Sequence, residues 1–172
     1  MKRVVVISDV HGNLAALEAI VAKLGALKPD QVAILGDHAL FGPKPTETID
    51  LIRKLQSNGA LVTAGTGDIA VADLDYAASF PSLAGGLPPG LKAAVEWASD
   101  ELDDDRIEWL RSLPTERRLR YGEISVTFCH ASPGSPIPAT PLVRGRRRGP
   151  SMWIMWLISP QCRGWRLSWV SC

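Results

Sequence analysis

The stretch VVVISDVHGN, residues 4–13, decides the fold of this chain. Its apolar half, Val4 to Ile7, predicts a short strand that is buried on both faces. A carboxylate, Asp9, and an imidazole, His11, follow that strand directly. In open parallel sheets, ligands bind beyond the carboxyl ends of the strands. An Asp-x-His pair at such an end indicates the beginning of a metal site, because it brings an oxygen donor and a nitrogen donor together.

The strand opens a regular alternation of helices and strands. Apolar residues at helical spacing predict a helix over residues 14–24, capped by Asn13 and ended by Gly25. A strand, a helix and another strand are expected next, at residues 32–35, 46–56 and 60–63. This order predicts an α/β domain with a parallel sheet that is covered by helices.

The following part of the chain predicts two more helices and a hairpin. Residues 91–102 have helical spacing, and a short helix after them is expected to be capped by Asp104 or Asp105. The turn signal at Gly122 predicts a hairpin between two strands, at residues 117–121 and 124–128. The second of these strands leads directly to His130, a further candidate ligand.

Four side chains with metal-binding groups are expected to meet at one edge of the sheet: Asp9, His11, Asp37 and His130. Mixed carboxylate and imidazole donors suit Mn, Fe, Ni or Zn better than Ca, which prefers oxygen ligands alone. Two such ions about 3.5–4 Å apart can hold the attacking and leaving oxygens of a phosphoryl group. Asp37 would be shared between the ions, and metal-bound hydroxide would attack phosphorus.

Three motifs in this order are similar to those of the calcineurin-like metallophosphoesterases: DVHGNL at residues 9–14, GDHALFGP at 36–43 and CHASP at 129–133. The segment LRSLP at residues 110–114 adds to the likeness. The chain most resembles the small single-domain bacterial phosphodiesterases and phosphatases of this family, over residues 3–138. The resemblance implies a layered α-β-β-α sandwich that hydrolyses a phosphoester with two divalent metal ions.

The resemblance also implies a role for each candidate ligand. Asp9 and His11 would bind the first ion, Asp37 would bridge both ions, and His130 would bind the second. In the family, an Asn and often a catalytic His follow a glycine and complete the second ion's site. This chain has Thr66 and Gly67 at those places. No catalytic residue beyond the metal ligands is therefore assigned.

Two residues beside the ligands are candidate substrate contacts. Asn13 follows the first motif, in addition to its expected role as a helix cap. His38 follows the predicted bridging aspartate, at a place where relatives usually carry an apolar residue. The partner that these residues imply is a phosphoester substrate, whose identity the sequence leaves open.

The sequence changes character after residue 138. The last acidic residue is Glu123, and six arginines and four of the six tryptophans lie within residues 144–169. The family's closing Gly-His-Thr-His segment, which supplies two more metal ligands, has no counterpart, because no histidine follows His130. We predict a metallophosphoesterase-like domain at residues 1–138, truncated or frameshifted in its C-terminal part, and an atypical tail at 139–172. Reading the encoding DNA in its other two frames past codon 138 tests this hypothesis.

Two alternatives to a working two-ion hydrolase remain open. In the first, the chain is an impaired relative that binds at most one ion, at Asp9, His11 and Asp37. In the second, the basic and Trp-rich tail binds nucleic acid or a membrane surface. Hydrolysis of bis-p-nitrophenyl phosphate with added Mn separates the hydrolase from the impaired relative. Salt-dependent retention on DNA tests the second alternative.

The bulk composition is that of one globular domain. The chain has 172 residues, 46% of them hydrophobic, and a formal net charge of +1, which favours neither a nucleic-acid nor a membrane partner. The sequence shows no secretion signal, and its three cysteines are an odd number. We therefore expect a cytoplasmic protein with reduced thiols. The oligomeric state is left open.

Overall fold

The structure is a computed structural model that describes residues 3–83, 85–133 and 166–171. A parallel sheet of four strands forms its centre, in the order β3-β2-β1-β6. The strands are β1 (Arg3–Ser8), β2 (Gln31–Leu35), β3 (Leu61–Thr63) and β6 (Arg166–Ser171). In the register of the sheet, Val5 is opposite Val32 and Ile34 is opposite Val62. The predicted parallel sheet is confirmed, and all its strands end at the same edge.

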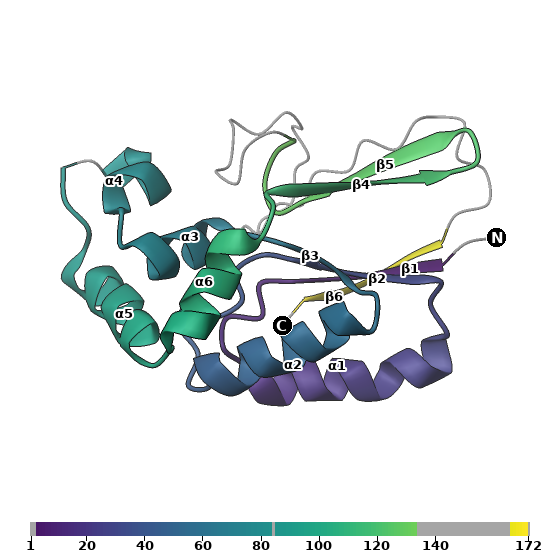
Figure 1. Cartoon of the computed structure of the whole chain (residues 1–172), viewed down its shortest axis with the longest axis horizontal. Helices are drawn as coiled ribbons and strands as arrows, with labels where there is room; N and C mark the ends of the chain where they lie inside the picture. Colours follow the sequence, from purple (N-terminus) through teal and green to yellow (C-terminus); the bar gives the residue numbers. More distant parts are fainter. Residues whose placement is uncertain (1–2, 84, 134–165, 172) are drawn as a thin grey trace, which may run out of the picture.

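The two faces of the sheet are covered differently (Figure 1). The helices α1 (Leu14–Leu27) and α2 (Pro45–Ser57) lie against one face. An antiparallel hairpin of β4 (Glu116–Tyr121) and β5 (Ile124–Cys129) lies over the other. The described residues therefore form a helix layer, a parallel sheet and a second small sheet. This agrees with the expected α/β class and with three layers of the expected sandwich.

Alternating side chains of β1 explain how the layers adhere. Val5 and Ile7 belong to the large core cluster that includes residues of the helices, such as Leu17. Val4 and Val6 belong to a second cluster, in which Phe128 of the hairpin packs against the sheet. These four residues of β1 are 2% exposed or less. Successive residues of a strand point to opposite faces, so an apolar run is what a strand covered on both sides requires.

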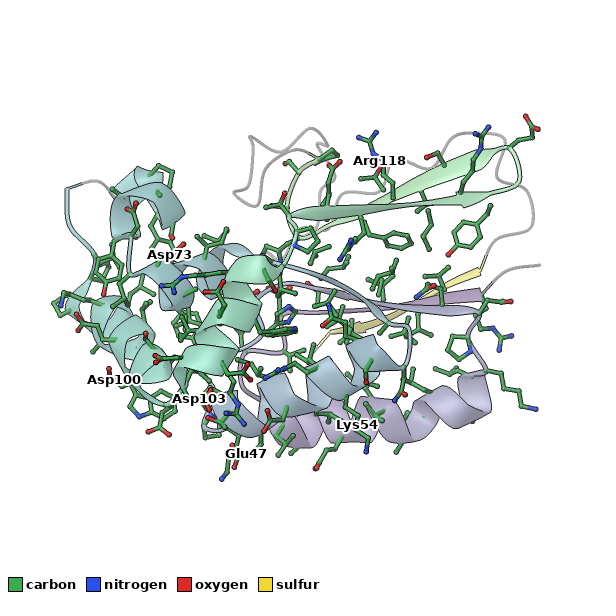
Figure 2. All side chains as sticks on the ribbon, viewed as in Figure 1. Glu47, Lys54, Asp73, Asp100, Asp103 and Arg118 are labelled. Carbon is green, nitrogen blue, oxygen red and sulfur yellow. The ribbon has the colours of Figure 1, made fainter. Side chains whose placement is uncertain are left out.

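A group of helices lies beyond the edge where the parallel strands end (Figure 1). It comprises α3 (Thr66–Asp73), α4 (Tyr76–Ser79), the 3-10 turn η1 (Pro81–Leu83), α5 (Pro89–Asp100) and α6 (Asp104–Ser112). Ion pairs join α6 to its neighbours: Arg111 pairs with Asp73 of α3, which is labelled in Figure 2, and Arg106 pairs with Asp50 of α2. None of the described helices has the length and apolar character needed to cross a membrane.

The predicted element boundaries need three corrections. The first helix does not stop at Gly25 but continues to Leu27, where Lys28 takes the left-handed conformation and its N–H bonds to Leu24. A Cβ added at Gly25 would meet no heavy atom within 4 Å. Gly25 lowers the helix propensity at its position but does not end the helix. The cap of α6 is Asp103, whose side chain accepts from the N–H of Arg106, and neither Asp104 nor Asp105. The third correction is that α3 and α4 were not predicted as helices.

The predicted domain boundary at residue 138 lies outside the described residues, as does most of the tail. The described part of the tail is β6, whose backbone pairs with β1 from Arg3↔Arg166 to Ser8↔Ser171. The division into a domain at 1–138 and a tail at 139–172 stays a prediction.

Candidate metal centre

Three strands deliver the candidate ligands to one place. Asp9 follows β1, Asp37 follows β2, and His130 follows β5 of the hairpin. Backbone hydrogen bonds join the first two loops, from the Asp9 N–H to the Gly36 oxygen at 3.2 Å and from the His11 N–H to the Asp37 oxygen at 2.8 Å. The hairpin therefore contributes to a site that begins in the parallel sheet.

The backbone is strained at three of the four candidate ligands. Asp9, His11 and Asp37 have φ values of 56°, 50° and 55°, in the left-handed region that residues with a Cβ rarely adopt. Such conformations cost free energy and persist only where the surrounding structure holds them, which is most often at functional sites. Here the strain turns the side chains of these short loops toward one another.

The donor atoms of the candidate ligands lie close enough to surround an ion. Asp9, Asp37 and His130 each offer one donor atom, and these atoms lie within 4.8 Å of one another. His11 Nε2 lies 3.7 Å from Asp9 Oδ1 and 3.8 Å from Asp37 Oδ2, and His130 Nε2 lies 3.6 Å from Asp37 Oδ2. The structure thus brings together all four residues that were predicted as ligands.

A hydrogen bond orients His130. Its Nδ1 lies 2.8 Å from the carbonyl oxygen of Leu35, so Nδ1 carries the proton and Nε2 is left toward Asp37. Burial opposes protonation of this ring most strongly, but the charge of Asp37 and the Leu35 carbonyl together outweigh it and raise the pKa of His130 above its usual value. The imidazole is therefore held in the orientation and tautomer of a metal ligand.

In each aspartate, one carboxylate oxygen accepts a hydrogen bond and the other faces His11. The Ser8 hydroxyl donates to Asp9 Oδ2, and the Gly67 N–H donates to Asp37 Oδ1 at 2.8 Å. The other oxygens, Asp9 Oδ1 and Asp37 Oδ2, are the ones that face His11. A Cβ at Gly65 would lie 2.4 Å from Asp37 Oδ1, so this close approach requires glycine. The hydrogen bonds leave one oxygen of each aspartate available to an ion.

Asp68 is a functional residue that the sequence reasoning did not assign. Its carboxylate is 1% exposed and accepts three backbone N–H groups, from Asp37 at 2.8 Å, His38 at 2.7 Å and Gly65 at 2.9 Å. It thereby ties the loop after β2 to the start of α3. The available signal was an acidic residue three positions after the glycine that precedes a helix, which is capping-box spacing.

The two predicted substrate contacts lie in different surroundings. Asn13 is exposed and caps α1, with its side chain accepting from the Ala16 N–H at 3.1 Å, so the predicted cap is confirmed. Its contact with a substrate stays a prediction. His38 is 0% exposed, and its Nε2 lies 3.0 Å from the Thr63 oxygen and 3.6 Å from Asp68 Oδ2. His38 thus faces polar groups of the interior, and its contact with a substrate also stays a prediction.

The residues present fit a divalent cation. They supply two carboxylate oxygens and two imidazole nitrogens. Hydrogen bonds orient Asp9, Asp37 and His130, whereas the buried Nδ1 of His11 has no hydrogen-bond partner among the described residues. The four side chains of this cluster are 11% to 30% exposed, so the site is open to solvent on one side. Such a donor set suits a transition metal or zinc.

Comparison with known proteins agrees with this arrangement. A family model described as calcineurin-like phosphoesterase matches residues 2–133, which contain every element of the candidate metal centre. The chain belongs to the calcineurin-like phosphoesterases. The predicted family is therefore confirmed, whereas its small bacterial branch is not decided by these comparisons.

Relatives of this phosphoesterase occur in both archaea and bacteria. A metallophosphoesterase from Sphaerobacter thermophilus is 32% identical, with a TM-score of 0.55, over 78% of this chain and 49% of that one. A hypothetical protein from Pyrococcus horikoshii is 28% identical, with a TM-score of 0.62, over 76% and 55% of the two chains. An uncharacterized protein of Methanocaldococcus jannaschii is 27% identical over 77% of this chain and 51% of its own length. The phosphoesterase chain thus spans about half the length of these relatives.

Proposed function

We propose that this chain is a metal-dependent phosphoester hydrolase, acting on phosphodiesters or phosphomonoesters. The observation that carries the proposal is the convergence of Asp9, His11, Asp37 and His130 at the carboxyl edge of the sheet, in a member of a phosphoesterase family. Divalent ions bound there supply charge for the phosphoryl oxygens and acidify a bound water. This chemistry needs ligands that are fixed in advance, and the strained loops and oriented imidazole provide them.

The protein's own groups position the reaction. The Ser8 hydroxyl and the Gly67 N–H each fix one aspartate, so that a single oxygen of Asp9 and of Asp37 faces the centre. Asp68 holds the backbone of Asp37 from the buried side. Relatives often carry a catalytic histidine at the position of Gly67, and glycine cannot donate a proton to the leaving group. Substrates whose leaving groups depart without a proton are therefore favoured.

The described residues offer few donor atoms for the two-ion arrangement that is expected from the family. The first ion would have Asp9, His11 and Asp37, and the second would share Asp37 and add only His130. Thr66 stands in for the asparagine of relatives, and no Asp, Glu or His follows His130 in the sequence. We therefore propose one firmly held ion, with any second ion bound weakly.

Hydrolysis of bis-p-nitrophenyl phosphate by the full chain with added Mn tests the proposed function. The wild type is expected to release p-nitrophenolate. Asp37→Asn is expected to lower this hydrolysis rate by more than about 100-fold, which exceeds the usual effect of removing a group that hydrogen-bonds to a metal ligand. Asp100→Asn is the matched control, because Asp100 is an exposed residue at the end of α5, labelled in Figure 2. Equal rates in the wild type and in Asp37→Asn would contradict the proposal.

A second candidate function is metal binding without turnover. Thr66 and Gly67, at places where relatives carry a ligand and a catalytic histidine, favour it. This candidate predicts that the chain retains an ion but hydrolyses no phosphoester above the rate of the metal alone. The nucleic-acid or membrane alternative depends on tail side chains outside the described residues.

A further inference from the structure

An exposed aromatic ring lies beside the candidate metal centre. Phe41 is 58% exposed, more than the other exposed large apolar residues of the described chain, Leu74 at 44% and Trp97 at 41%. Its ring centroid lies 5.3 Å from that of His11, with the two planes tilted by 56°. His11 in turn lies against Asp9 and Asp37, so Phe41 is in direct contact with a member of the donor cluster.

The loop holds Phe41 in place at a cost in conformation. Its φ is 79°, a left-handed value that is rare for a bulky residue with a Cβ. The next residue, Gly42, is pressed against the ligand loop, since a Cβ there would lie 1.9 Å from the His11 oxygen. The Gly12 N–H also bonds to the His38 oxygen at 2.7 Å, and the Lys44 N–H bonds to the Gly12 oxygen at 3.1 Å. A strained, well-held apolar side chain facing solvent indicates a functional contact rather than a packing role.

A second, independent observation concerns the leaving group. The site has no side chain at residue 67, where relatives often place a catalytic histidine, and the described imidazoles are otherwise engaged: two in the donor cluster and His38 in the interior. An alcohol leaves poorly without a proton, whereas a phenol, with an unperturbed pKa near about 10 as in tyrosine, leaves readily as its anion.

From these two observations we propose that the substrates of this chain are phosphoesters of aromatic alcohols, and that Phe41 recognises their ring by stacking. Planar rings attract one another in offset or tilted arrangements, and one face of an exposed ring is available for this. The inference rests on the proposed function for turnover, but the recognition of an aryl group by Phe41 is a separate property that binding alone measures.

The reaction of such a substrate balances with water as the only co-reactant. The oxygen of water forms a bond to phosphorus, and the bond between phosphorus and the aryl oxygen breaks. The electron pair of that bond leaves with the phenolate, and the water protons pass to solvent. The products are a phenol, once its anion is protonated in solution, and the phosphate or the remaining monoester.

Binding of two non-hydrolysable probes tests the recognition directly. Phenylphosphonate and methylphosphonate share the charged group and differ in the ring, and their affinities for the full Zn-supplemented chain can be measured by titration calorimetry. The wild type is expected to prefer phenylphosphonate by about fivefold or more, the low end of what one stacked ring contributes. Phe41→Leu is expected to lose this preference, and Phe41→Tyr to keep it. Trp97→Leu, which removes another exposed aromatic residue, on α5, is the matched control and is expected to keep it.

The outcomes separate recognition from turnover. Phe41→Leu is expected to leave the methylphosphonate affinity within about twofold of the wild type, because leucine still packs against His11. An equal loss for both probes would show that Phe41 only supports His11 and would overturn the proposal, as would the absence of a phenyl preference in the wild type. If the preference is present and depends on Phe41 while phenyl phosphate, methyl phosphate and the diester bis-p-nitrophenyl phosphate all stay intact, the recognition stands and the proposed hydrolase function fails.

Discussion

At the scale of single residues, the geometry of the metal centre depends on Asp68. Its buried carboxylate accepts the backbone N–H groups of Asp37, His38 and Gly65, and so joins two loops that are far apart in sequence. Each of these N–H groups would lack a partner if the carboxylate were removed. A buried donor without a partner costs about 1–3 kcal/mol.

We expect Asp68→Ala to lower the free energy of unfolding by about 3 kcal/mol or more, because three donors lose one acceptor. Urea unfolding measures this change. Asp73→Ala is the matched control, since Asp73 pairs with Arg111 at the surface and both side chains are 46% exposed, so it is expected to cost about 1 kcal/mol or less. Similar losses in the two variants would contradict the role given to Asp68.

The glycines of the site give a second residue-scale prediction. A Cβ at Gly65 would lie 2.4 Å from Asp37 Oδ1 and 2.5 Å from the Asp37 nitrogen. Gly65→Ala is therefore expected to displace Asp37 and to weaken metal binding about 10-fold or more, as measured by competition with a chelating dye. Gly25→Ala, inside α1 with open space around it, is expected to leave metal binding unchanged and to raise stability by about 0.5–1 kcal/mol. Unchanged affinity in Gly65→Ala would contradict the close approach.

At the scale of the elements, Arg106 joins α6 to α2. Its guanidinium donates to both carboxylate oxygens of Asp50, at 3.0 and 2.8 Å, and also pairs with Asp103 at 2.5 Å. The hydrogen bond to Asp50 is the largest of the effects that raise the pKa of Arg106, so this side chain is charged wherever the protein is folded. A bidentate pair of this kind is more specific than a single contact.

Arg106→Lys is expected to lower the free energy of unfolding by about 1 kcal/mol, because an ammonium group cannot reproduce the paired geometry. Thermal unfolding with a matched surface variant checks this. Lys92→Ala breaks an exposed i,i+4 pair with Glu96 within α5 and is expected to cost about 0.5 kcal/mol or less. If Arg106→Lys unfolded at the same temperature as the wild type, the bidentate contact would contribute nothing measurable to stability.

The elements also show what a sequence can and cannot predict. The apolar runs of β1, β2 and β3 and the turn at Gly122 are local signals, and they predicted the strands and the hairpin correctly. The ends of β1 and β2 bring Asp9, His11 and Asp37 together, because parallel strands finish at one edge, and the end of β5 in the hairpin adds the fourth candidate ligand, His130. The burial of His38, the contacts of Asp68 and the exposure of Phe41 depend on loops that meet only in the folded chain. No local pattern carries that information, so those features were not predicted.

At the scale of the whole molecule, one edge of the sheet gathers the candidate metal ligands, in a chain whose match spans about half the length of its relatives. The described residues offer three candidate donors to a first ion and only two to a second, one of them shared. The number of ions that the chain retains therefore depends on the described residues themselves. The number of retained ions also distinguishes a centre that can bind metal from the remnant of such a centre.

Elemental analysis of the metal bound per chain, after the full protein is saturated with Mn or Zn and passed through gel filtration, tests the central claim most directly. We predict close to one ion for each wild-type chain and none in Asp37→Asn, because Oδ2 of Asp37 lies within 3.8 Å of both imidazoles. A wild-type chain that retains no ion, or an Asp37→Asn chain that retains as much as the wild type, would contradict the claim that this edge of the sheet is a metal centre.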